Sequence, residues 1–99
     1  MSATVVVAFE AKPDRVEALL AFLSGVQSRV IEAGCLSISL LQDQYDPTRI
    51  FEIEVWKTAD DHKRFVQGAI SSGAFKPFDE LLAAPFKGNY LNTIKHSEA

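Results

Sequence analysis

Residues 32–61 read EAGCLSISLLQDQYDPTRIFEIEVWKTADD, and this stretch decides the fold. It contains two runs rich in β-branched and aromatic side chains, CLSISLLQDQ (residues 35–44) and RIFEIEVWK (residues 49–57), which are typical of strands. Between them lies YDPT, in which Pro47 has its φ angle preset for a turn and Asp46 can bond its own backbone. The stretch therefore predicts a β-hairpin.

Glu52, Glu54 and Trp56 share one face of the second predicted strand, because side chains alternate along a strand. Two carboxylates and an indole on the face of a buried sheet need polar partners or a cavity, so this hairpin is the place to look for function. Glu54 has two interpretations: a salt bridge to Arg49 or Arg64, or a polar anchor or proton acceptor for a substrate. Glu52 is expected to be solvated or in a cross-strand pair.

The flanking sequence extends the hairpin in both directions. TVVVAFE, residues 4–10, is a β-branched run, and apolar residues at spacings of three and four predict an amphipathic helix over residues 13–32. After the hairpin, Thr58 is a candidate N-cap for a second helix, which we expect to fray at Gly68. Residues 68–73, with a glycine at each end, are expected to form a flexible loop or a lid over a pocket.

The last third of the chain predicts a short helix and a strand. AFKPFDELLAA, residues 74–84, places Phe75 and Phe78 on one helix face, and FKGNYLNTIK, residues 86–95, predicts the final strand. Tyr90 and Asn92 would share one side of it, either as sheet or interface residues or as donors to a substrate carbonyl or phenolate. The order β-α-β-β-α-β, with the second helix broken in two, predicts an α+β fold of the ferredoxin-like split type, a four-stranded antiparallel sheet with helices on one face.

Composition agrees with one small domain spanning residues 1–99, of which 47% are apolar. A net charge of -3 without a basic cluster excludes nucleic acid as an expected partner, and no apolar run is long enough to span a membrane. One cysteine and a beginning unlike a signal peptide predict a cytoplasmic protein. All four predicted strands carry apolar residues on both faces, so we expect a homodimer to cover the face that the helices leave open.

Four short motifs resemble the antibiotic biosynthesis monooxygenase (ABM) family, and above all its quinol monooxygenase-like members. In order they are Ala33-Gly34-Cys35, Leu40-Leu41-Gln42-Asp43, Asp46-Pro47-Thr48-Arg49 and Glu54-Val55-Trp56. The resemblance implies a dimeric α+β barrel with a pocket in each subunit between sheet and helices. It also implies that Trp56, otherwise simply a core residue, is a flat wall for an aromatic substrate.

The chain departs from the family pattern at two positions. Phe65 stands where many ABM-like sequences carry a histidine, and Ala74 replaces the histidine of a Ser-x-His-Phe motif. His62 lies one helical turn before Phe65, on or near the same face, and could supply an imidazole from there, although a partly exposed surface histidine is the simpler interpretation. The missing histidines argue against the haem-degrading branch of the family.

Two functions follow as hypotheses. The first, which the resemblance implies, is a cofactor-independent monooxygenase that oxidises a small aromatic or hydroquinone-type substrate with O₂. The sequence fits such an enzyme in having no recognised metal, flavin or nucleotide motif. The second is a non-oxygenase protein of the same fold: an isomerase, a small-metabolite enzyme or a ligand-binding module. For the first, we expect His62 or Glu54 as the proton acceptor. The expected substrate-binding residues are Trp56, Phe65, Phe75, Phe78, Tyr90 and Asn92.

Overall fold

The computed structural model describes residues 2–99, which form four strands and three helices. Antiparallel pairing joins the four strands into one sheet with the order β2-β3-β1-β4. This is the predicted ferredoxin-like split arrangement, and it confirms the α+β fold class. The elements are β1 (Ala3–Glu10), α1 (Val16–Glu32), β2 (Cys35–Gln42), β3 (Arg49–Trp56), α2 (Ala59–Ser72), α3 (Phe78–Leu81) and β4 (Lys87–Leu91).

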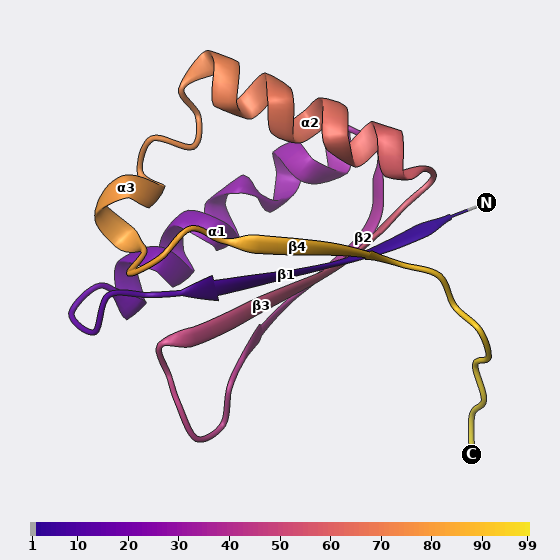
Figure 1. Cartoon of the computed structure of the whole chain (residues 1–99), viewed down its shortest axis with the longest axis horizontal. Helices are drawn as coiled ribbons and strands as arrows, with labels where there is room; N and C mark the ends of the chain where they lie inside the picture. Colours follow the sequence, from indigo (N-terminus) through magenta and orange to yellow (C-terminus); the bar gives the residue numbers. More distant parts are fainter. Residues whose placement is uncertain (1) are drawn as a thin grey trace.

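The two long helices, α1 and α2, lie on the same side of the sheet, and the short helix α3 lies on that side as well, at one end (Figure 1). Strand alternation matches this arrangement, because burial along β3 alternates between its two faces. On the covered face, Val5 pairs with Glu54 and Val7 with Glu52 across β1 and β3. The helices therefore cover the sheet face that carries the acidic side chains of the hairpin.

The other sheet face has no helix over it and carries apolar side chains, as the sequence predicted. Ile53 is 39% exposed, and Leu41 and Leu91 are exposed as well. The pairings Leu41 with Phe51, Ser39 with Ile53 and Thr4 with Leu91 place these side chains on the open face. This face is the one that the expected dimer would cover, and the dimer stays a proposal below.

The second helix is longer than predicted, and the third is shorter. α2 continues through Gly68 to Ser72, so residues 68–73 are not a flexible loop or a lid. Gly73 then ends the helix in the left-handed conformation with φ 81°, and its N–H bonds the Ile70 carbonyl. Of the helix predicted over residues 74–84, only the single turn of α3 forms.

The hairpin turn and the entry to α2 follow the predicted side-chain chemistry. Asp43 Oδ1 accepts hydrogen bonds from the backbone N–H groups of Tyr45 and Asp46 at 2.8 and 2.9 Å, which closes the turn. Thr58 caps α2 by accepting from the Asp61 N–H at 3.1 Å. These contacts fix β3 and the start of α2 relative to each other, and with them the residues of the candidate site.

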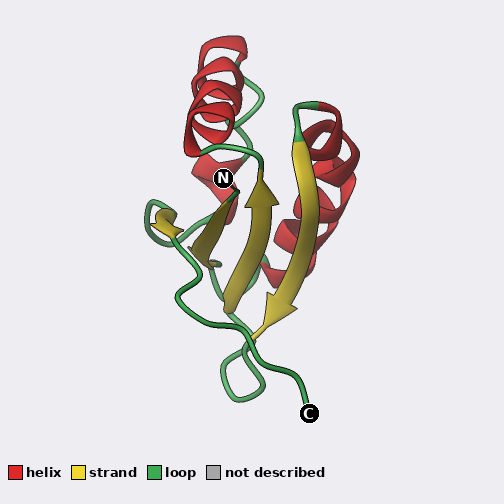
Figure 2. Ribbon diagram, turned by 90° about the vertical axis from the view of Figure 1, so that its right-hand side faces the viewer, coloured by secondary structure: helices red, strands yellow, loops and turns green. Residues whose placement is uncertain are grey.

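β4 ends at Leu91, before the predicted end of the last strand. The residues after it form an exposed tail that runs away from the sheet (Figure 2). Within residues 2–99, no helix combines the length and hydropathy needed to cross a membrane.

Candidate active site

A small inner cavity lies between the covered sheet face and the helices, with a volume of about 40 Å³. This volume is enough for a few water molecules but not for an aromatic ring system. Three polar side chains, those of Glu52, Glu54 and His62, interrupt a wall that is otherwise apolar. The apolar wall is formed by Val7, Phe9, Leu23, Val26, Val30, Phe65, Val66, Phe75, Phe78 and Phe86.

Glu54 is the centre of the polar group. Glu54 is only 4% exposed, and its Oε1 accepts a hydrogen bond of 2.7 Å from the indole Nε1–H of Trp56. The same oxygen lies 3.9 Å from Nε2 of His62. The predicted salt bridge of Glu54 with Arg49 or Arg64 is therefore wrong, because β3 turns Glu54 toward the helices, among apolar side chains.

His62 comes from the first turns of α2, one turn after the Thr58 cap, and is 8% exposed. Its Nδ1 is hydrogen-bonded to the Tyr90 hydroxyl at 2.8 Å, and its ring stands edge-on to Trp56 with 5.3 Å between ring centroids. Burial lowers the pKa of His62, and the nearby Glu54 opposes this effect in part. The expectation of a partly exposed surface histidine is wrong. His62 bridges β3 and β4 as a largely neutral imidazole.

Glu52 is the residue that the sequence interpretation misjudged most. It is 5% exposed, and its Oε2 is buried without any hydrogen-bond partner. Burial, followed by the neighbouring Glu54, raises the pKa of Glu52 to about 8. Period-two alternation had already placed Glu52 beside Glu54, so the same-face pattern was the signal for a second acid in the site.

The remaining residues predicted for substrate binding lie in three different places. Phe65, Phe75 and Phe78 line the inner cavity. Trp56 lies behind it, fully buried, with its ring 5.9 Å from that of Phe65. The structure places Asn92 beyond the end of β4, exposed and away from this group.

Two aromatic residues that the prediction did not name, Phe9 and Phe86, complete the cavity wall. Phe86 lies with its ring centroid 5.4 Å from that of Phe78 and 5.8 Å from that of Phe75. The sequence did contain a signal for Phe86: its even spacing from Tyr90 places both side chains on the same face of the last predicted strand. Phe9, on β1, had no signal beyond its position in a strand.

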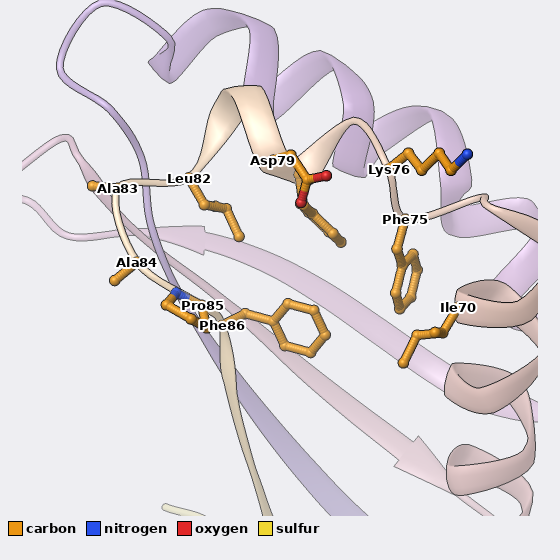
Figure 3. Close-up of a pocket in the computed structure, with 10 residues that line it drawn as sticks. Ile70, Phe75, Lys76, Asp79, Leu82, Ala83, Ala84, Pro85 and Phe86 are labelled. Atoms are coloured by element: carbon orange, nitrogen blue, oxygen red, sulfur yellow. The ribbon is translucent and has the colours of Figure 1, made fainter.

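A larger groove of about 620 Å³ opens at the surface between the end of α2, α3 and the start of β4. Its inner wall shares Phe75, Phe78 and Phe86 with the small cavity. Figure 3 shows the rings of Phe75 and Phe86 and the side chain of Ile70 pointing toward one another across this groove. The three shared rings therefore separate a surface groove of ligand size from the buried acidic group.

The polar group has the parts needed for proton transfer. Glu54 and His62 are hydrogen-bonding bases in a cavity that excludes bulk water, where charge–charge and hydrogen-bond interactions are stronger than in solution. Tyr90, 43% exposed, connects His62 to the solvent side of β4. Among residues 2–99, no group of three or more His, Cys, Asp or Glu side chains is arranged to hold a metal ion.

Comparison with known proteins identifies the family. The antibiotic biosynthesis monooxygenase family model matches residues 2–77, which is more than half of the chain. No curated protein matches the chain.

Solved structures with the same fold agree with this match. The Pseudomonas aeruginosa protein PA3566 is 26% identical, with 95% of each chain covered and a TM-score of 0.79. A Chloroflexus aurantiacus protein is also 26% identical, with 98% of each chain covered and a TM-score of 0.73. A Nitrosomonas europaea protein is 23% identical over 94% of this chain and 90% of its own, with a TM-score of 0.82. The last two carry the words antibiotic biosynthesis monooxygenase in their names. The chain belongs to the antibiotic biosynthesis monooxygenase family.

Proposed function

We propose that the protein is a cofactor-independent monooxygenase that oxidises a small aromatic or hydroquinone-type substrate with O₂. The observation that carries this proposal is the buried contact between Glu54, Trp56 and His62 beside an aromatic-lined cavity. The family match and the names of two structural neighbours support the same reaction class. A homodimer formed through the open sheet face belongs to this proposal, because it would cover the exposed apolar side chains there.

The substrate supplies the electrons in this reaction. Glu54 or His62 accepts a proton from the phenol or its keto tautomer, and the resulting anion reduces O₂. One oxygen atom becomes a carbonyl oxygen on the substrate carbon. That carbon loses two hydrogens, which leave with the second oxygen atom as water. The protein orients the substrate on its aromatic wall and keeps bulk water away from the anion.

The ring must reach the acidic group through the surface groove. The inner cavity is too small for it, so Phe75 and Phe86 have to move apart when the substrate binds. Phe75 lies in the turn between α2 and α3, and Phe86 precedes β4, so both rings come from segments outside the long helices and the sheet. Substrate entry through the groove of Figure 3 is therefore part of this proposal.

Oxygen uptake tests the proposal. Purified protein is mixed with a panel of hydroquinones and anthrones, and O₂ consumption is followed with an oxygen electrode. We expect uptake with at least one member, and a loss of about 10²-fold or more in Trp56→Ala, since a misplaced substrate costs that much. Glu17→Gln, an exposed change on α1, is the matched control. No uptake with any compound would instead favour the non-oxygenase alternative, a binding protein or an isomerase of the same fold.

A further inference from the structure

The side chains of Glu52 and Glu54 form a pair of acids with no cation to neutralise them. They stand two residues apart on the covered face of β3, both are buried, and both line the inner cavity. No lysine or arginine is present in the cavity wall. Two carboxylates this close and this buried cannot both stay ionised, so the pair holds one proton.

The hydrogen bonds decide which acid keeps the proton. Glu54 Oε1 already accepts the indole N–H of Trp56 at 2.7 Å, so this carboxyl group serves as a hydrogen-bond acceptor. Glu52 has no such donor, and its Oε2 has no partner at all. Glu52 is therefore the neutral acid of the pair, in agreement with its raised pKa.

We propose that Glu52 and Glu54 act as one acid–base pair on a substrate oxygen, with Glu54 taking the proton and neutral Glu52 donating a hydrogen bond to the oxygen anion that forms. This inference rests on the proposed function and assigns the acid and the base of its proton-transfer step. Glu52 is then a catalytic residue. A neutral carboxyl in an apolar site is a strong donor to an enolate, because it brings no competing charge.

The proton-transfer step needs no oxygen. The substrate C–H or O–H bond breaks, its proton forms an O–H bond with Glu54, and the electron pair stays on the substrate as an enolate or phenolate. Reversal of the step returns a solvent-derived hydrogen to the same carbon. Under anaerobic conditions the protein should therefore exchange the methylene hydrogens of anthrone for deuterium from D₂O.

Other titratable groups surround the pair and have to be separated from it. His62 faces it from α2, Tyr90 lies behind His62 on β4, and Cys35 lies on β2 with its thiol bonded to the carbonyls of Ser37 and Val55. α1 and α3 contribute only apolar side chains to the cavity wall. Substitution at position 52 is thus needed to assign any pH-dependent signal to this pair.

Two measurements test the proposal. The first is infrared spectroscopy at pH 7: the wild type should show the C=O band of a neutral carboxylic acid, which shifts in D₂O and is lost above about pH 8. The band should be absent from Glu52→Gln and retained in the Glu17→Gln control. Absence of the band from the wild type, or its persistence in Glu52→Gln, overturns the assignment of the proton, whatever the substrate is.

The second measurement is the anaerobic deuterium exchange of anthrone, followed by NMR. Glu52→Leu should lose about 10²- to 10³-fold in exchange rate, as expected for a removed oxyanion donor. Glu52→Gln keeps an N–H donor and should retain more of the rate, without the fall above about pH 8 that ionisation of Glu52 causes in the wild type. Exchange that is absent from the wild type, or equally fast in Glu52→Leu, overturns the pair. Oxygen uptake without exchange would leave the monooxygenase proposal standing and remove this one.

Discussion

Replacing Glu52 by glutamine should make the protein more stable at alkaline pH. The folded state raises the pKa of Glu52 from 4.5 to about 8, so folding favours the protonated form of this side chain. Its contribution to stability is fully present below pH 4.5, decreases as pH rises, and is lost above about pH 8. A difference of about 3.5 between the two pKa values corresponds to a cost of about 5 kcal/mol for ionising the buried carboxyl.

Glu52→Gln removes this cost, because an amide does not ionise. Urea unfolding at several pH values and one fixed protein concentration measures the effect as the difference in unfolding free energy between variant and wild type. The difference should grow from pH 5 to pH 9 by several kcal/mol in favour of the variant, whereas Glu17→Gln should show no such growth. A difference that stays constant with pH would refute the burial argument, since the amide's own packing cost does not depend on pH.

Four further outcomes follow from the structure. Trp56→Phe should lower the unfolding free energy by about 2 kcal/mol in urea titrations, because it removes the indole donor of Glu54; a neutral effect would mean that this bond contributes little. For His62, burial lowers the pKa, so any acid limb that His62 adds to the pH–rate profile for oxygen uptake should lie below pH 6.5 and disappear in His62→Ala; a limb above 6.5 excludes His62 as its origin. Gly73→Ala should cost about 1–2 kcal/mol in thermal or urea unfolding, since alanine is strained at φ 81°; an unchanged midpoint would contradict the left-handed cap. Sedimentation should show a dimer at micromolar concentration that Ile53→Asp converts to monomer, because this side chain lies on the open sheet face; a wild-type monomer would remove the dimer proposal.

The sequence predicted the fold well because its strongest signals are local. Alternation along residues 49–56, the turn around Pro47 and the Thr58 cap each act within a few residues, and the structure has all three. Gly68 was misleading because glycine lowers helix stability by only about 1 kcal/mol, and packing of α2 on the sheet outweighs that. The end of the last strand could not be predicted, because it depends on where pairing with β1 stops, at Thr4 with Leu91.

The sequence predicted one part of the candidate site, because that part also depends on a local pattern. Periodicity placed Glu52, Glu54 and Trp56 on one strand face, and the structure brings His62 against them from α2. What the sequence could not supply is which sheet face the helices cover, since both faces carry apolar side chains. The covered face determines whether Glu52 is exposed to water or lies in a closed cavity. Which face is covered depends on contacts between elements far apart in the chain.

The indole of Trp56 gives this protein a built-in optical probe. It is the single tryptophan of the chain, it is fully buried, and its N–H is bonded to Glu54. Emission excited at the red edge of the indole band, where tyrosine does not absorb, therefore comes from one known environment. Its wavelength and lifetime should respond to a proton gained or lost by the neighbouring acids and to a quinone arriving at the aromatic wall. Ligand screening and stopped-flow kinetics can thus be done on the unlabelled wild-type chain.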